Sequence, residues 1–273
     1  MGALEDALAL SQTWDVPHAS AVVVTADGTS AASAGDQDLV YRLASVTKLL
    51  SAYATLVAVE EGALSFDQPA GPPGATVAHL LAHTAGYDFS TTTIRAAPGE
   101  RRLYSNTGFE VLADLLESET GITFDAYARE AVFAPLGMTA TTIGGSAAAG
   151  GSSSCRDLAR FAVELQRPRL LDSETLATAT RVAFPGLRGV LPGFGLQREN
   201  DWGLGLEVRG VKSPHWTGSA NSPETFGHFG QSGTFLWVDP RAGAALIALT
   251  DRPFGEWAAQ AWPPFSDAVL AAL

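Results

Sequence analysis

The chain has 273 residues, 46% of them hydrophobic, so it can bury one large core or the cores of two interleaved domains. Its 17 basic and 29 acidic residues give a net charge of −12, which argues against nucleic-acid and membrane partners. No apolar run approaches a membrane span in length, and the single Cys155 excludes an internal disulfide. The N-terminal segment has no basic residue before its apolar run, which is not typical of a signal peptide, and we predict a cytoplasmic protein.

The first part of the chain predicts a helix, a β-hairpin and a second, longer helix. Residues 1–14 have the pattern of a short amphipathic helix. The β-branched run from Ala21 to Thr25 predicts a strand, and a second strand follows over Thr29 to Ala34. Residues Leu43 to Glu61 then predict a buried amphipathic helix, because their apolar side chains recur at helical spacing.

The pattern changes twice in the rest of the chain. A segment rich in Pro and Gly, Asp67 to Gly74, marks a boundary, and Gly144 to Ser154 predicts a flexible turn. Helical periodicity is present over residues 76–83, 107–119, 124–133 and 157–166. Strand patterns cover residues 203–209, 225–230, 233–239 and 244–250, and a terminal helix covers 256–273.

Together these elements predict an α+β fold. An antiparallel sheet would be built from both termini and flanked by helices, with an all-α subdomain inserted between its halves. We predict that residues 1–66 and 174–273 form the sheet domain and that residues 67–173 form the helical insertion. An active site would lie between the two.

The first turn of the long helix contains an unusual pair of polar residues. Lys48 opposes the helix dipole there, at a cost of about 0.3–1 kcal/mol, and it lies one turn from Ser45 on the same face. An amine held where its charge is disfavoured could take the serine proton and turn the hydroxyl into a nucleophile. The alternative is a capping serine followed by a surface lysine.

Two further motifs lie at the ends of predicted elements. The segment Tyr104 to Asn106 precedes a helix that Asn106 could cap, and the alternative is a buried tyrosine beside a capping residue. The segment His228 to Gly230 lies in a glycine-rich run, where a substrate or another backbone can approach closely. A plain glycine-rich hairpin is the structural alternative.

In order and spacing, these three motifs resemble the S-x-x-K, Y-x-N and K-T-G elements of the serine β-lactamase and penicillin-binding-protein superfamily. The resemblance is greatest to class C β-lactamases and family VIII carboxylesterases, and it covers nearly the whole chain. Supporting stretches are residues 80–86, 135–138, 157–161 and 202–205. The fold class predicted above is the one that this resemblance implies.

The resemblance also implies roles in an acyl-enzyme mechanism. Ser45 would be the acylated nucleophile, Lys48 would tune and shuttle its proton, and Tyr104 would act as base and then as acid toward the leaving group. Whether Lys48 or Tyr104 is the general base stays open, because coupled groups share their titration. Asn106 would orient Lys48 and the substrate. The backbone N–H groups of Ser45 and Gln231 would form the oxyanion hole.

The third motif departs from the superfamily pattern. His228 and Phe229 stand where lactamases have a lysine and a threonine, which help to hold the β-lactam carboxylate. We therefore expect poor β-lactam turnover, a more apolar site and a preference for uncharged acyl groups. With Gly230, both residues are predicted to bind substrate. Further aromatic candidates for lining the site are Trp202, Trp216 and Phe226.

Other chemistries fit the sequence less well. His79 and His83 have the i,i+4 spacing of zinc ligands, but Leu80 stands where the H-E-x-x-H motif needs glutamate, so we expect neither metal nor cofactor. His215 lies beside Trp216 and is expected to be structural. No G-x-S-x-G elbow is present, which argues against an α/β-hydrolase.

We therefore predict a serine hydrolase that cleaves small esters or amides through an acyl-enzyme at Ser45. A D-amino-acid-directed peptidase or weak β-lactamase of the same fold is the first alternative. A non-catalytic ligand-binding domain is the second, and the presence of Ser45, Lys48 and Tyr104 together argues against it. Acyl-chain preference, physiological substrate and oligomeric state stay open.

Overall fold

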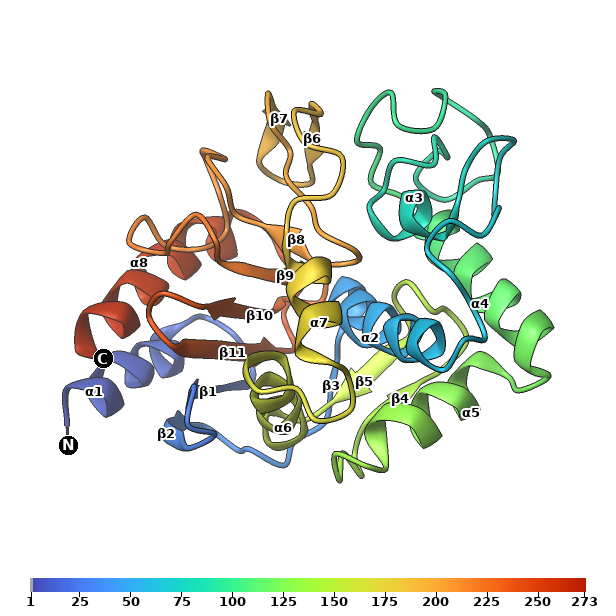
Figure 1. Ribbon diagram of the computed structural model, residues 1–273. Coiled ribbons are helices and arrows are strands. Elements are labelled where there is room, and N and C mark those ends of the chain that lie inside the picture. The colour runs from blue at the N-terminus through green and yellow to red at the C-terminus, as the bar shows by residue number, and fades with distance from the viewer. Residues whose placement is uncertain (1) are drawn as a thin grey trace.

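The computed structural model describes residues 2–273, and its centre is a six-stranded antiparallel sheet (Figure 1). The strand order is β2-β1-β11-β10-β9-β8. The strands are β1 (Ala19–Thr25), β2 (Ser30–Ala34), β8 (Glu207–Val208), β9 (Phe226–Gly230), β10 (Thr234–Asp239) and β11 (Ala244–Thr250). They come from both ends of the chain, so the predicted α+β fold class is confirmed.

Helices cover both faces of this sheet. On one face, α1 (Ala3–Ala9) packs with α8 (Glu256–Ala272), and the turn η1 (Leu10–Thr13) follows α1. On the other face lie α2 (Thr47–Glu60) and α6 (Cys155–Gln166). Side chains alternate along a strand, so Val22 joins the core around α2 while Val23 joins the core under α8.

Shorter elements surround this centre. The remaining helices are α3 (Val77–Leu81), α4 (Asn106–Thr120), α5 (Phe124–Ala128), the π-helical turn η3 (Arg129–Phe133) and α7 (Ser173–Thr180). A three-stranded sheet contains β3 (Tyr41–Arg42), β5 (Gly151–Ser153) and β4 (Thr142–Ile143), and a separate hairpin contains β6 (Gly189–Leu191) and β7 (Gly195–Gln197). Helix α6 packs on β1 and β11 although it lies in the predicted insertion 67–173, and the domain division stays a prediction.

Helix α2 differs from the predicted helix in two respects. It begins at Thr47, after the 3₁₀ turn η2 (Ala44–Val46), so Ser45 is not its cap residue. Every residue from Thr47 to Ala58 is buried, so the helix is not amphipathic. Helices α4 and α5 and strand β9 pack around it, and a helix enclosed in this way can be apolar on all sides.

The segment predicted as a flexible turn is held by hydrogen bonds. The Glu110 carboxylate accepts from the backbone N–H groups of Ala147 (3.2 Å) and Ala148 (3.3 Å) and from the Ser146 hydroxyl. The Ser51 hydroxyl donates to the carbonyl of Ala147 at 2.6 Å. The prediction was wrong because the small residues of this segment gain their order from side chains elsewhere in the chain.

Within residues 2–273, no helix has both the length and the apolarity that a bilayer crossing needs. The cytoplasmic location stays a prediction.

Candidate active site

Ser45 lies in the turn η2, and strands β9 and β10 hold this turn in place. The Thr234 hydroxyl donates to the carbonyl of Leu43 at 3.0 Å. A Cβ atom on Gly230 would lie 2.1 Å from the same carbonyl oxygen, so only glycine allows this approach. Ala44 has a φ of 44°, in the left-handed region that is costly for residues other than glycine. The turn that carries Ser45 is therefore clamped in a strained conformation.

Lys48 is fully buried, and its ammonium group contacts three oxygen atoms. It lies 3.3 Å from Ser45 Oγ, 2.7 Å from Asn106 Oδ1 and 3.0 Å from the carbonyl oxygen of Ala148. Burial lowers the pKa of Lys48 to about 7, and the charge of Glu110 opposes this shift. Near neutral pH, a substantial fraction of Lys48 is therefore an uncharged amine beside the serine hydroxyl.

Tyr104 places its ring against Lys48, with Nζ 4.7 Å from the ring centroid. Its hydroxyl lies 3.3 Å from Nε2 of His228. Nδ1 of His228 lies 2.6 Å from the carbonyl oxygen of Phe229, to which it must donate, so the neutral ring accepts from Tyr104 at Nε2. Burial raises the pKa of Tyr104 above its ordinary value, and the Ser45 hydroxyl lowers it in part. Tyr104 is therefore a phenol in the resting site.

His228 is a neutral group at this position. Burial and the charge of Lys48 lower its pKa to about 3, although Glu207 acts in the opposite direction. Its ring packs against Tyr104 (5.7 Å between centroids) and Trp202 (5.3 Å). The superfamily that the sequence resembles has a lysine at this position, whereas this chain has an uncharged hydrogen-bond acceptor.

Asn106 does not cap helix α4. Ser105 is the cap residue, and its hydroxyl accepts from the N–H group of Gly108 at 3.3 Å. Asn106 becomes the first helical residue, so its amide oxygen is free to bind the ammonium group of Lys48. The prediction of the cap was wrong by one residue because serine and asparagine cap helices equally well.

Two backbone N–H groups beside the serine are without partners. Within residues 2–273, the N–H groups of Ser45 and Gln231 donate no hydrogen bond. Gln231 follows β9, which packs against the turn η2, and it lines a pocket of about 650 Å³ together with Ala44 and Ala149. Both groups are available to a ligand, and their assignment as oxyanion donors stays a prediction.

The side chain of Phe229 does not line this site. Consecutive residues of a strand point to opposite faces, so Phe229 faces α8 while His228 faces Tyr104. Phe229 packs against Phe254 (4.9 Å between ring centroids) and Trp216 (5.9 Å) in the core under α8. Of the other aromatic candidates, Trp202 packs on Tyr104, whereas Trp216 and Phe226 are core residues.

His83 is a neighbour of the site that sequence reasoning did not assign to it. Its ring lies 4.6 Å from Tyr104 and 4.5 Å from Trp202, and its Nδ1 accepts from the N–H group of Ser105 at 3.2 Å. Helix α3 ends before His83, so His79 and His83 do not share a helical face. His83 thus fixes the backbone and ring of the segment that carries Tyr104.

Comparison with solved structures supports the fold. A β-lactamase from Mycobacterium bovis is 55% identical with a TM-score of 0.96, covering 97% of this chain and 98% of that chain. EstCE1, described as a hydrolase with promiscuous acyltransferase activity, is 17% identical with a TM-score of 0.81, covering 98% of both chains. At that identity the second likeness shows the fold alone.

Curated relatives match over shorter stretches. The D-alanyl-D-alanine-carboxypeptidase/endopeptidase AmpH of Escherichia coli is 28% identical over an alignment of 142 residues, and the match covers 38% of this chain and 37% of AmpH. A putative D-alanyl-D-alanine carboxypeptidase of Escherichia coli is 24% identical over an alignment of 211 residues, and the match covers 59% of this chain and 48% of the relative. Each alignment spans less than half of the relative.

A comparison with protein families covers more of the chain than either curated relative. The sequence profile of the Beta-lactamase family matches residues 10–271, which include every motif discussed above. This chain therefore belongs to the Beta-lactamase family.

Proposed function

We propose that this protein is a serine hydrolase that cleaves small esters or amides through an acyl-enzyme at Ser45. The observation that carries the proposal is the environment of Lys48, a buried ammonium group that contacts only uncharged oxygen atoms and lies 3.3 Å from Ser45 Oγ. Such a site favours the free amine, which is the form that can accept the serine proton.

The proposed reaction proceeds in two steps. Ser45 Oγ bonds to the acyl carbon as its proton passes to Lys48, and the bond from that carbon to the leaving atom breaks. Tyr104 gives its proton to the leaving atom and regains one from Lys48. Water then bonds to the acyl carbon and loses a proton to the same pair, the bond from that carbon to Ser45 Oγ breaks, and Oγ takes the proton back from the pair, which leaves the acid and free Ser45. The raised pKa keeps Tyr104 protonated in the resting site, so it holds the proton that the leaving atom needs, and the lowered pKa of Lys48 suits a base.

The neutral ring of His228 supports esters or amides with uncharged acyl groups over β-lactams. A peptidase directed at D-amino acids is the second candidate, and the names of the curated relatives favour it. A ligand-binding domain without catalysis is the third. The absence of a fixed cation at position 228 argues against recognition of a carboxylate next to the scissile bond.

Active-site labelling tests the proposal. A fluorophosphonate should add once to the wild-type protein by intact-mass measurement, and Ser45→Ala should abolish the adduct. Ser232→Ala is the matched control, because Ser232 lines the pocket near Gln231 but makes no contact with Lys48. The control should keep the adduct. An unlabelled wild-type protein, or label on Ser45→Ala, would contradict the proposal and favour the ligand-binding reading.

Substrate comparison ranks the candidates. We expect hydrolysis of p-nitrophenyl acetate and butyrate to exceed that of nitrocefin and of a D-Ala-D-Ala peptide. Faster release of D-alanine than of p-nitrophenol would instead assign the protein to the peptidases.

A further inference from the structure

A second pocket, of about 480 Å³, opens beside Tyr104. Tyr104 lines this pocket, whereas Gln231 lines the separate one described above. One wall is the loop 87–95, which follows α3, and the other is the hairpin β6–β7. In Figure 1 the hairpin (yellow) and the loops around α3 (cyan) rise on the same side of the molecule. The pocket therefore adjoins the group proposed to protonate the leaving atom.

The loop 87–95 is tied to the catalytic segment. The carboxylate of Asp88 pairs with Arg95 at 2.6 Å and closes the loop. The N–H group of Asn106 donates to the carbonyl of Phe89 at 2.7 Å, and the Ser105 hydroxyl donates to the carbonyl of Asp88 at 2.7 Å. This wall therefore has a fixed position relative to Tyr104.

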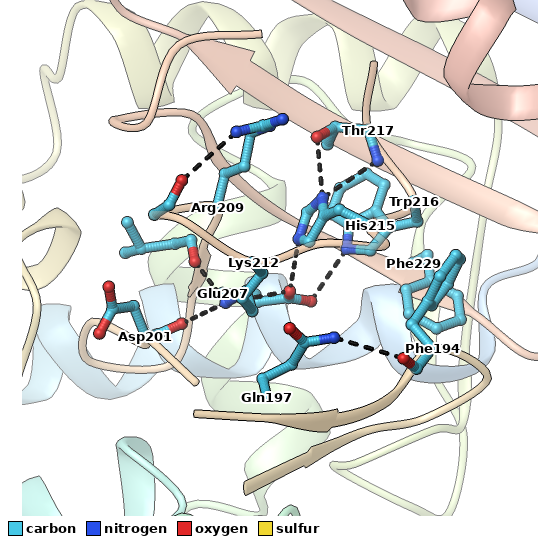
Figure 2. A network of polar contacts seen from close by, with 12 residues as sticks. Phe194, Gln197, Asp201, Glu207, Arg209, Lys212, His215, Trp216, Thr217 and Phe229 are labelled. Carbon is cyan, nitrogen blue, oxygen red and sulfur yellow. Dashed lines mark hydrogen bonds and ion pairs between the residues drawn. The ribbon is translucent and has the colours of Figure 1, made fainter. Parts of the chain in front are cut away.

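The hairpin is held by a network of buried polar groups (Figure 2). Gln197 donates from Nε2 to the carbonyl of Pro214 at 3.3 Å, and its Oε1 accepts from the N–H group of Ser213 at 3.3 Å. The adjoining residues Lys212 and His215 both bind the carboxylate of Glu207, at 3.3 and 2.8 Å. The second wall is therefore anchored to strand β8.

The pocket is locally positive in an acidic protein. It is lined by four arginines and a single carboxylate, that of Asp88. This carboxylate already forms an ion pair with Arg95. Arg102 is buried, donates to four backbone carbonyls and has no carboxylate partner within the described chain. Arg188 is exposed and forms no ion pair among residues 2–273, and Arg101 lies 4.0 Å from Glu100. Nε of Arg101 is buried without a hydrogen-bond partner.

The remaining lining of the pocket is largely apolar. Its apolar and aromatic members are Tyr87, Phe89, Leu103, Val190, Pro192 and Leu196. An elongated group with an apolar body and an anionic end would match both parts of this surface.

We infer that this pocket binds the leaving group of the substrate and selects leaving groups whose apolar body ends in a carboxylate. The inference rests on the proposed function, since the leaving group must lie beside Tyr104 to receive its proton. Arg101 and Arg188 bind the carboxylate, because a guanidinium group matches its planar geometry with paired N–H donors. The carboxylate sits at the far end of the leaving group, away from Ser45.

A matched pair of esters tests this inference. The probes are 4-(carboxymethyl)phenyl acetate and its carboxamide, 4-(carbamoylmethyl)phenyl acetate, which share the acyl group and differ in one charge. We expect kcat/KM to be about fivefold higher for the carboxylate, the effect of roughly one exposed ion pair. The preference should decrease at high salt.

Variants assign the preference to the pocket. Arg101→Gln and Arg188→Gln should each bring the ratio of the two kcat/KM values toward one, and Arg188→Glu should reverse it. Arg198→Gln is the matched control, because Arg198 is also exposed and follows the same hairpin but does not line the pocket. The control should keep the wild-type ratio. Because the readout is a ratio, a general loss of folded protein does not imitate the effect.

Three outcomes would overturn the inference. The first is equal turnover of the two esters by wild type, which leaves the serine hydrolase intact. The second is an equal loss of preference in Arg198→Gln. The third is a preference that depends on Arg188 for phenyl hydrogen succinate over phenyl succinamate, which carry the charge on the acyl side. If the wild-type protein hydrolysed neither of the two phenyl acetates and the fluorophosphonate did not label Ser45, the proposed function itself would be contradicted.

Discussion

The two lysines of the chain are both buried, yet their surroundings differ in one respect. Lys212 lies 3.3 Å from the carboxylate of Glu207 and donates to the carbonyls of Asp201 (2.7 Å) and Val208. Lys48 contacts only uncharged oxygen atoms. Burial lowers the pKa of both amines, and a carboxylate opposes the shift in each case, but among the described residues only Lys212 forms an ion pair with its carboxylate.

The carboxylate of Glu207 explains why Lys212 has a structural role whereas Lys48 is proposed to be reactive. Burial pushes the pKa of Glu207 upward, but the charges of Lys212 and His215 outweigh it and hold the pKa at about 2. Glu207 therefore stays ionised, and its contact with Lys212 holds the segment 212–215, whose backbone binds Gln197 of the hairpin β6–β7. Burial alone therefore does not mark a reactive lysine. A reactive lysine is indicated when the buried amine also has no counter-charge and lies within reach of a hydroxyl group.

Removing the amine from the serine site should give the largest effect on activity. Lys48→Met should lower kcat/KM for p-nitrophenyl butyrate by about 10³-fold, since acid–base groups of this kind contribute about 10²–10⁴. The free energy of unfolding at pH 6 should not decrease, because the variant removes a buried charge that has no ionic partner. Urea unfolding measures it. Retained activity would contradict the assignment of Lys48 to the reaction.

Removing the carboxylate of Glu207, which pairs with Lys212, should lower the free energy of unfolding. Glu207→Ala leaves Lys212 buried and unpaired, and we expect the free energy of unfolding to fall by about 3–5 kcal/mol. The double variant Glu207→Gln with Lys212→Met is the control, and it should recover part of the loss. A decrease below about 1 kcal/mol in Glu207→Ala would show that the ion pair is not the anchor we describe.

The pKa of Lys48 predicts how activity depends on pH. With a pKa of about 7, kcat/KM should rise with pH through that value as the free amine forms. Asn106 Oδ1 stabilises the charged form, so Asn106→Leu should move this limb to lower pH by about one unit. A shift to higher pH would contradict the contact we assign to Asn106.

The same pKa fixes the sign of a stability effect. The pKa of Lys48 is lower in the folded protein than its unfolded value of about 10.4, so the unfolded chain holds the proton between these two values. The contribution of Lys48 to the free energy of unfolding therefore increases with pH from about 7 to about 10. Urea unfolding over this range should show a slope that Lys48→Met reduces.

The smallest expected effect on activity comes from Glu110, which binds the backbone of the loop whose Ala148 carbonyl contacts Lys48. Glu110→Gln removes a charge that raises the pKa of Lys48, so the pH limb should move down by a few tenths of a unit. The amide still accepts from one or both backbone N–H groups of Ala147 and Ala148, and stability should change little. A shift as large as that in Asn106→Leu would indicate that the loop itself has moved.

Several parts of this molecule were predictable from local pattern. The hairpin β1–β2, the strands β9 to β11 and the helices α4 and α8 each repeat their pattern over several residues. The structure places Ser45 and Tyr104 beside Lys48 and places His228 beside Tyr104, whereas the catalytic roles that the resemblance implies stay predictions. Strands β3 to β7 are two or three residues long, which is too short for alternation to be read.

The parts that were missed depend on distant contacts or on strand parity. The carbonyl of Ala148 is 100 residues from Lys48 and lies in a segment of small residues that has no pattern. Phe229 was placed at the site because it stands where the K-T-G element has its threonine, but adjacent strand residues face opposite sides of the sheet. The arginines beside Tyr104 come from two loops, whose sequences carry no periodic signal.

The hairpin β6–β7 is not hydrogen-bonded into the six-stranded sheet. Its length and composition can therefore vary without altering the register of the strands that fix the turn at Ser45. Gene duplicates could therefore diverge in substrate range through changes in this hairpin while the catalytic residues stay the same. For directed evolution of substrate range, a library confined to residues 188–196 is the natural starting point.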